Sequence, residues 1–320
     1  MKILSIIYGN PCAYSILEDG KIIESKSFDN NTNPVDEFRN NNDLSEIRYF
    51  ATTFPESNLI KKNSQDYKDI QIAAANNDGQ IYCLGNNQSI ASNSYFSSKL
   101  KDSIIITLMD EGEEQNRFMS SATIWEGKEN LIRPVHSFES NEFNIIRIWS
   151  NIAQTTFNLK PSLESFSKIE KISKKGDSEK YSEKMWKMIT ENHDIVSMNL
   201  TSKNIKSYFN LFSENGIDSE NKEDIAAAIQ KCTSNLFITI IESLSEIKDI
   251  KNICLSGLAS FNKGSIKDVK LKFPDTKIYT SKTKDLTEIT NGAAMYVWNI
   301  VLDDNIKNKK GEKDSKNENN

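Results

Sequence analysis

Residues 2–27 read KILSIIYGNPCAYSILEDGKIIESKS, three short β-prone runs separated by two turns. The first run is Lys2–Tyr8, and the second, Ala13–Leu17, passes through Asp19-Gly20 into the third, Lys21–Ser27. An Asp-Gly pair between two such runs is a strong signal for a tight hairpin. The sequence therefore predicts that the chain starts with a meander of three strands.

A second set of strand patterns follows a polar stretch of weak periodicity at 28–70. The expected elements are strands at Ile70–Ala75 and Gln80–Leu84, a helix at Ser89–Lys99, a strand at Ser103–Met109, and strands at Ser121–Trp125 and Leu131–Val135 joined by a turn at Gly127. The continuous apolar run Ser103–Met109 is typical of a buried strand. Strands and helices thus alternate through the first half of the chain.

The second half is richer in helical patterns. Residues 141–215 have helical spacing, with a Lys/Ser/Glu-rich patch at 168–184 that we interpret as exposed surface or loop, and Asp218–Lys248 is apolar nearly all round, as in a buried helix. The remaining expected elements are a strand at Lys251–Leu255, a turn at Ser256–Ala259, a helix at Phe261–Phe273, a strand at Lys277–Thr280 and a helix at Thr287–Val301. We predict a first subdomain at 1–140, a helical segment and second subdomain at 141–302, and a disordered charged tail at 303–320.

Composition limits the classes of function. A chain of 320 residues with 37% hydrophobic residues and a net charge of −5 is large enough for a sizeable core and is not a basic nucleic-acid binder. Only two histidines, His136 and His193, are present, and the four cysteines lack C-x-x-C spacing, which favours free thiols over a zinc site. No stretch has the length of a signal-peptide core or a membrane span. We therefore expect a cytoplasmic protein with no membrane or nucleic-acid partner.

Four of the twelve glycines attract attention by their positions. Gly9, Gly112 and Gly257 follow predicted strands, and Gly292 lies early in the last helix. Glycine at a strand end allows a phosphate to approach the backbone closely, although each of these glycines alone is better explained as an ordinary turn residue. None belongs to a Walker or G-x-G-x-x-G loop. Only the four glycines taken together, in this order along the chain, favour a nucleotide-binding protein.

Six segments resemble, in order, those of the O-carbamoyltransferases of nodulation-factor and antibiotic biosynthesis. The segments are Ile6–Glu24 (family pattern I-S-x-G-H-D-x-S-A-A-L-x-x-D-G-x-I-V-A), Gly85–Phe96 (H-H-x-S-H-A-A-S-A-F), Leu108–Glu113 (V-D-G-x-G-E), Ile225–Gln230 (I-A-A-x-x-Q), Asn252–Asn262 (L-S-G-G-x-A-x-N) and Gly292–Ala294 (G-A-A). The series extends from the N-terminus to about residue 300.

This resemblance implies an α/β protein with an actin/hexokinase-like ATPase fold, in which two related subdomains each have a mixed sheet and flanking helices. It implies binding of ATP or an adenylate, with Mg²⁺ as a further expected cofactor. By position, Gly9, Asp110 and Gly112 would face the phosphates, and Ser256, Gly257 and Asn262 would border the nucleoside. Capping of the next element is an equally good explanation for Asp110.

The chain departs from the family pattern where the family has histidines. Asn10, Asn86, Asn87 and Ile90 stand at the four imidazole positions, Pro11 replaces an aspartate, and Leu258 replaces the second glycine of the L-S-G-G turn. An amide is a poor ligand for a transition metal and cannot act as a base, and isoleucine can do neither. We therefore expect no transition-metal site, and no catalytic residue can be assigned.

Two interpretations of function follow. In the first, the chain is a divergent carbamoyltransferase that retains a nucleotide-binding cleft, and its ancestral reaction, ATP-dependent carbamoyl transfer to a hydroxyl, is weakened or lost. In the second, it is a non-catalytic subunit that binds a nucleotide or a partner and works with a complete carbamoyltransferase. The family continues into a YrdC-like domain, so a protein with that domain is another expected partner. A small-molecule kinase is a third interpretation, and Asp110 is the one strand-end candidate for the catalytic aspartate that it would need beside the acceptor.

Overall fold

The computed structural model describes residues 1–7, 12–28, 32–53, 65–109, 113–114, 117–118, 120–139, 145–160, 163–191, 221–245, 249–257, 262–282, 285 and 287–302. The chain divides into two compact units that are both discontinuous in sequence. The first unit is Met1–Asp102, Gly127–Arg133 and Ser281–Asn320, and the second is Ser103–Glu126 and Pro134–Thr280. The predicted division at residue 140 and the disorder of 303–320 stay predictions.

The first unit is built on a five-stranded mixed sheet. Its strands are β1 (Lys2–Ile7), β2 (Cys12–Glu18), β3 (Lys21–Phe28), β4 (Tyr49–Thr53) and β5 (Gln80–Leu84), in the order β3-β2-β1-β4-β5. The three N-terminal strands form the predicted antiparallel meander, while β4 is parallel to both β1 and β5. Asp19 and Gly20 have φ angles of 47° and 81°, the positive values that a tight Asp-Gly hairpin requires.

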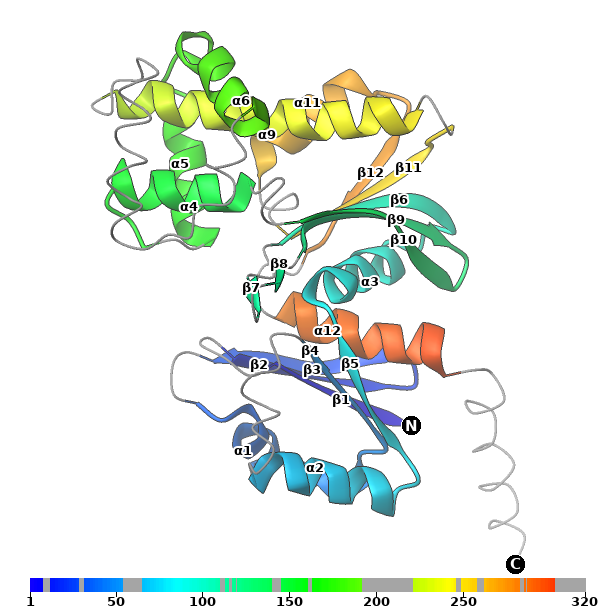
Figure 1. Cartoon of the computed structure of the whole chain (residues 1–320). Helices are drawn as coiled ribbons and strands as arrows, with labels where there is room; N and C mark the ends of the chain where they lie inside the picture. Colours follow the sequence, from blue (N-terminus) through cyan, green and yellow to red (C-terminus); the bar gives the residue numbers. More distant parts are fainter. Residues whose placement is uncertain are drawn as a thin grey trace, which may run out of the picture. The chain divides into compact units, whose positions relative to one another are not determined.

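Helices cover both faces of this sheet (Figure 1). They are α1 (Pro34–Arg39), the 3-10 turn η1 (Leu44–Glu46), α2 (Gln65–Asn76), α3 (Asn86–Ser98) and α12 (Thr287–Tyr296), which continues as the π-helical turn η4 (Val297–Val301). The strand predicted at Ile70–Ala75 is wrong, because these residues belong to α2. Ile70, Ala73 and Ala74 share the buried side of this helix at three- and four-residue spacing, whereas Ile72 is exposed.

Alternation along the strands produces two cores, one on each side of the first sheet. Leu4, Ile6 and Phe50 pack with Phe38 of α1 and the buried residues of α2. Their neighbours point the other way, and the second cluster contains Ile3, Leu17, Tyr49, Ala51, Leu84, Ala293, Ala294, Val297 and Leu302. The α12 helix therefore closes the second face of the sheet.

Gly292 allows α12 to lie close against α3. A Cβ atom at Gly292 would lie 1.7 Å from the carbonyl oxygen of Ser89 and 3.0 Å from the backbone nitrogen of Asn93. No side chain fits at such distances, so glycine is required by helix packing. The structure thus explains Gly292 without a phosphate.

The second unit repeats the strand order of the first. Its strands are β6 (Asp102–Leu108), β9 (Ser120–Lys128), β10 (Leu131–Glu139), β11 (Asn252–Gly257) and β12 (Lys277–Thr280), in the order β10-β9-β6-β11-β12. The short pair β7 (Glu113–Glu114) and β8 (Arg117–Phe118) forms a separate ribbon. The turn predicted at Gly127 is displaced, because Gly127 lies inside β9 and Glu129 has the positive φ of the turn. Two related subdomains with mixed sheets are therefore present, as the resemblance implies.

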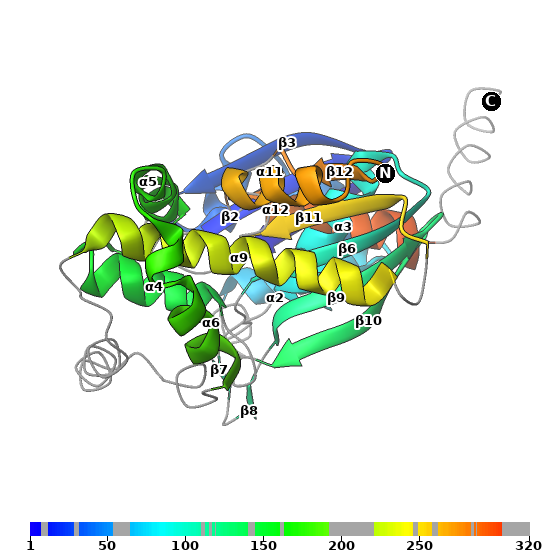
Figure 2. The same ribbon diagram turned by 90° about the horizontal axis from the view of Figure 1, so that it is seen from above.

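The helices of the second unit form one layer over the sheet and a separate group beside it. They are α4 (Ile145–Thr155), α5 (Leu163–Ser173), the 3-10 turn η3 (Ser178–Lys180), α6 (Ser182–Glu191), α9 (Lys222–Ser245) and α11 (Lys263–Lys272). Figure 2 shows α9 and α11 side by side over β11. The α9 helix is long and buried, as predicted. The prediction of surface or loop at 168–184 is wrong in part, because α5 and α6 take in much of it and Ile169 and Tyr181 are buried.

Candidate functional site

Half of the predicted nucleotide contacts lie outside the described residues. These are Gly9, Asp110 and Gly112, the three residues expected to face phosphates. Asn10, Pro11 and Leu258 are also outside. The other three predicted residues, Ser256, Gly257 and Asn262, belong to the second unit and are described.

Ser256 and Gly257 are the last two residues of β11. The prediction that they belong to a turn is therefore wrong. They pair with Thr107 and Leu108 of the parallel strand β6, so the carboxyl ends of both strands meet here. Gly257 has a φ of +65°, a backbone conformation that favours glycine. Ser256 is fully buried, and its Oγ has no hydrogen-bond partner among the described residues.

Asn262 is the N-cap of α11. Its Oδ1 accepts a hydrogen bond from the backbone N–H of Ser265 at 2.9 Å and another from Nε2 of Gln230 at 2.7 Å. The backbone N–H of Gly264, one residue before Ser265 in the first turn of α11, donates to the buried carboxylate of Glu170 at 2.9 Å. The N–H groups of Gly264 and Ser265 at the start of α11 are therefore already hydrogen-bonded to protein side chains. Through these bonds Gln230 links α11 to α9, and Glu170 links α11 to α5.

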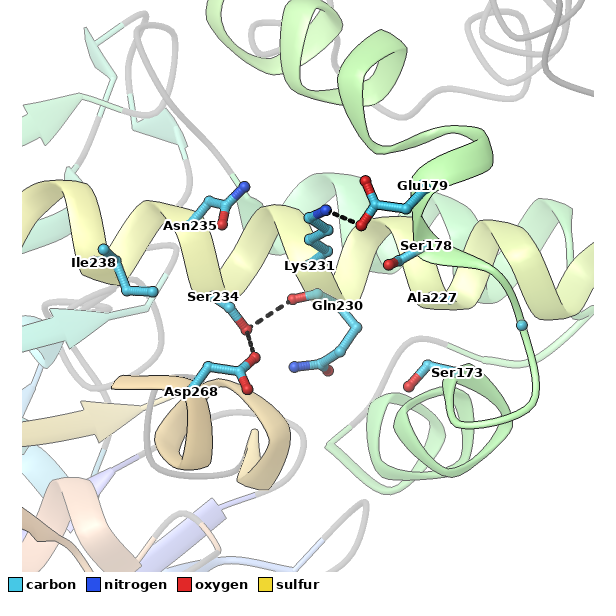
Figure 3. A pocket seen from close by; sticks show the side chains of 11 residues that line it. Ser173, Ser178, Glu179, Ala227, Gln230, Lys231, Ser234, Asn235, Ile238 and Asp268 are labelled. Atoms are coloured by element: carbon cyan, nitrogen blue, oxygen red, sulfur yellow. Dashed lines mark hydrogen bonds and ion pairs between the residues drawn. The ribbon is translucent and has the colours of Figure 1, made fainter. Parts of the chain in front are cut away.

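A pocket of about 380 Å³ lies beside this helix start, between α9, α11 and the α5–η3 connection (Figure 3). The lining residues are Ser173, Gly176, Ser178, Glu179, Ala227, Gln230, Lys231, Ser234, Asn235, Ile238 and Asp268. On one side, Ser234 Oγ donates to the Asp268 carboxylate at 2.6 Å. On the other, Lys231 forms an ion pair with Glu179. The pocket walls combine polar groups of both signs of charge with the apolar side chains of Ala227 and Ile238.

Gln230 connects the pocket to α11. Its Nε2 donates to Asn262 Oδ1 and to Ser265 Oγ, the latter at 3.0 Å, while its Oε1 is buried without a hydrogen-bond donor among the described residues. Gly264 makes this approach possible, since a Cβ there would lie 2.6 Å from Gln230 Nε2. A ligand in the pocket could supply the donor that Oε1 lacks.

The η3 turn is held against α9 by Asp224. The Asp224 carboxylate accepts from the backbone N–H of Asp177 at 2.8 Å and from Lys180 Nζ at 3.0 Å. These two donors, the N–H first, lower the pKa of Asp224 below its ordinary value. The contacts fix the turn that places Ser178 and Glu179 at the pocket.

Sequence reasoning missed most of this pocket. Gln230 was noticed only as part of the Ile225–Gln230 segment, and Ser234, Asp268 and Gly264 were not singled out. The available signal was a stripe on α9, Ala227, Gln230, Ser234 and Ile238, at three- and four-residue spacing. Polar residues within an otherwise apolar buried helix need partners, and that requirement could have identified the stripe.

A transition metal does not fit the described residues at the family's histidine positions. Asn86 and Asn87 lie in the first turn of α3 and are buried, as is Ile90. Two amides and an alkyl side chain provide no imidazole or thiolate. Among the residues that the structure describes, no group of three or more His, Cys, Asp or Glu side chains could hold a metal ion.

His136 and Cys232 are not candidates for catalysis. His136 is exposed on β10 and packs against Phe138 with ring centroids 4.5 Å apart, whereas His193 lies outside the described residues. Burial raises the pKa of the Cys232 thiol to about 12, so this thiol is protonated and inert at neutral pH.

The architecture has counterparts among solved structures. The ADPNP-bound activator of the 2-hydroxyisocaproyl-CoA dehydratase from Clostridium difficile is 14% identical, with a TM-score of 0.51 and 98% coverage of both chains. Component A of the (R)-2-hydroxyglutaryl-CoA dehydratase from Acidaminococcus fermentans is 13% identical, with a TM-score of 0.50, over 92% of this chain and 97% of that one. The fold is that of the actin/hexokinase-like ATPases.

This ATPase-like fold is also found in a much longer protein. Full-length HypF in its phosphate- and nucleotide-bound form is 12% identical, with a TM-score of 0.54, over 95% of this chain and 47% of that one. No family model and no curated protein matches the sequence. Separately, none of the helices in the described part of the chain has the length and apolar character of a membrane span.

Proposed function

We propose that the chain binds an adenine nucleotide, ATP or an adenylate, with the nucleoside in the pocket between α9, α11 and η3. The observation that carries this proposal is the position of the pocket, which reaches the start of α11 through the Gln230–Asn262 hydrogen bond. Its volume of about 380 Å³ is in the usual range for small-ligand sites. The ATPase-like fold supports it, since two of its relatives described above are nucleotide-bound.

The chemistry of the pocket suits a nucleoside. Gln230 Oε1 can accept from the amino group of a base, because it is buried and has no donor among the described residues. The Asp268 carboxylate and the Ser234 hydroxyl can bond ribose hydroxyls. Ser256 and Gly257, at the carboxyl end of β11, are not among the residues that line this pocket, and their contacts with the nucleoside stay predictions from the resemblance.

The phosphates are not assigned to the start of α11. Helix N-termini commonly bind phosphate through free N–H groups, but here Glu170 and Asn262 already occupy those of Gly264 and Ser265. The contacts of Gly9, Asp110 and Gly112 with the phosphates, and of Mg²⁺ with them, stay predictions from the resemblance.

For the reaction, we propose that the ancestral ATP-dependent carbamoyl transfer to a hydroxyl is weakened or lost. The amides of Asn86 and Asn87 at the start of α3 support this, since neither can ligate a transition metal well or act as a base. The second candidate is a non-catalytic subunit that works with a complete carbamoyltransferase or a protein with a YrdC-like domain. Slow carbamoyl transfer by the purified chain alone from carbamoyl phosphate and ATP would refute the second candidate, and transfer at the rate of a complete carbamoyltransferase would refute both.

Calorimetry with ATP, ADP and AMP tests nucleotide binding. We expect saturable binding at millimolar nucleotide and a loss of affinity of about tenfold or more, roughly 1.4 kcal/mol, in Ala227→Trp, which fills the pocket from α9. The matched control is Glu242→Trp on the same helix, which disrupts only a partly exposed ion pair with Lys272. No binding to the wild-type chain, or equal binding by both variants, contradicts the proposal.

A further inference from the structure

Residues 174–180 form one wall of the pocket and have no apolar anchor of their own. The segment follows Ser173 and precedes Tyr181, which are both buried. None of the residues between them is buried, and none belongs to the hydrophobic core of the second unit or packs against it. The residues of this segment that line the pocket are Gly176, Ser178 and Glu179 (Figure 3). We call residues 174–180 the strap.

Polar contacts with α9 hold the strap in its present position. The backbone N–H of Asp177 donates to the Asp224 carboxylate at 2.8 Å, and Lys180 Nζ donates to the same carboxylate at 3.0 Å. Lys231 also pairs with Glu179, but this ion pair contributes little because the Glu179 side chain is 74% exposed. In the described part of α9, Asp224 is the one side chain that bonds the backbone of the strap.

Gly176 lets the strap lie directly on the backbone of α9. A Cβ atom at this position would lie 2.0 Å from the carbonyl oxygen of Glu223 and 2.7 Å from the backbone nitrogen of Asp224. Any larger residue would therefore hold the strap away from α9. The closed position depends on two features, which are the Asp224 carboxylate and the missing side chain of Gly176.

A segment attached in this way can open while the rest of the unit stays folded. Local opening needs little free energy where few apolar contacts are lost and the broken hydrogen bonds lie near solvent. The strap meets both conditions, and its two ends stay fixed because Ser173 and Tyr181 are buried. Opening would move Ser178 and Glu179 away from α9 and remove one wall of the pocket.

We propose that the strap opens and closes this pocket, that Asp224 is the positioning residue which holds it closed, and that a bound nucleotide stabilises the closed form. The role of Asp224 is a property of the empty protein, whereas the coupling to nucleotide rests on the proposed function. A ligand that fills the pocket contacts both α9 and the strap. It therefore binds the closed form more tightly and shifts the equilibrium toward it.

Native-state proteolysis measures how often the strap opens. Trypsin cleaves after lysine, and Lys174 and Lys175 are exposed residues of the strap, so mass spectrometry can follow cleavage at these two bonds separately from all others. At low trypsin concentration the rate follows the population of the open form. Without nucleotide, we expect Asp224→Ala to raise this rate about tenfold or more, the effect of losing hydrogen bonds to a charged group. Asp224→Asn keeps an acceptor for the N–H of Asp177 and should raise the rate by only about threefold.

Two further variants separate the role of Asp224 from a general loss of stability. Gly176→Ala leaves Asp224 intact but blocks the closed position, so it should also raise the cleavage rate about tenfold or more. Glu242→Ala is the matched control, because it removes an ion pair with Lys272 on the same helix and should leave the rate unchanged. Thermal unfolding gives the global stability of each variant. Equal rates in Asp224→Ala and Glu242→Ala, or faster cleavage only in proportion to a loss of global stability, would overturn the role of Asp224.

ATP tests the coupling between the strap and the pocket. If ATP binds only the closed form, a free concentration of ten times its calorimetric Kd should slow cleavage of the wild type at the two strap bonds about tenfold. ATP binding that leaves this rate unchanged overturns the coupling, while the proposed function stands. Failure of ATP to bind at all refutes the proposed function and the coupling together, and the variants measured without nucleotide still decide the role of Asp224.

Discussion

Replacing Gly292 by alanine tests the packing of α12 on α3, because two effects of opposite sign compete there. Alanine in a helix interior is more favourable than glycine by about 1 kcal/mol, so helix propensity alone predicts a more stable protein. The new Cβ, however, would lie 1.7 Å from the Ser89 carbonyl oxygen, and ordinary contact begins at 3.4 Å. Both neighbours are backbone atoms that cannot rotate away, so the helices must separate.

Overpacking of this kind costs about 1–3 kcal/mol and sometimes more. An overlap this close belongs at the upper end of that range, about 3 kcal/mol, so after the gain in propensity is subtracted we expect Gly292→Ala to lose about 2 kcal/mol, a fall in melting temperature of about 4–8 °C. Thermal unfolding followed by circular dichroism measures it. The control is Gly292→Ser, whose larger side chain should cost more. Unchanged or higher stability in Gly292→Ala would refute the close approach, and reduced nucleotide affinity at unchanged stability would favour the phosphate-contact interpretation of this glycine.

Two further predictions concern the core of the second unit. Trp149 Nε1 donates to Thr233 Oγ1 at 2.9 Å in the buried core, so Thr233→Val should cost about 1–3 kcal/mol in urea unfolding. Adding Trp149→Phe should cost less than the two single changes together, and strict additivity would contradict a hydrogen bond between them. Cys232 ionises near its ordinary pKa of 9.0 when unfolded but only at about 12 when folded, so the stability this thiol contributes is complete below about pH 9 and is lost between pH 9 and 12. Cys232→Ala should therefore lose less stability than the wild type between about pH 8 and 10.5, and parallel pH profiles would show that burial does not suppress its ionisation.

Strands with a visible turn could be predicted from the sequence, and strands without one could not. The N-terminal meander is marked by Asp19-Gly20, and Lys277–Thr280 is bounded by polar turns, so both were found. The strand Tyr49–Thr53 was missed because all five residues are buried, so alternation is absent, and because it ends in two threonines, so it also lacks the continuous apolar run that identified Ser103–Met109. Ile70–Ala75 was assigned to a strand because the run is short, and length alone does not distinguish a buried strand from part of a helix.

Local sequence patterns can predict a site residue only where its residue type has a preferred structural role. Asn262 was predicted only from the resemblance, as a residue bordering the nucleoside, and in the structure it is the N-cap of α11, a role that asparagine favours. The positions of Gln230 and Asp268 in the pocket result from contacts between helices whose residues are more than thirty positions apart in sequence. A local sequence pattern cannot predict such contacts. Gly292 was noticed as a glycine that would let a phosphate approach, but the group that approaches it is the backbone of α3.

The discontinuity of the first unit affects the order in which the protein can form during synthesis. The face of the first sheet made by Ile3, Leu17 and Ala51 is covered by Ala293 and Val297, which leave the ribosome after the whole second unit. Until then this apolar face has no permanent cover. A chain arrested before residue 287 should therefore expose it, and chaperones that bind apolar surface should associate with such nascent chains until α12 has emerged.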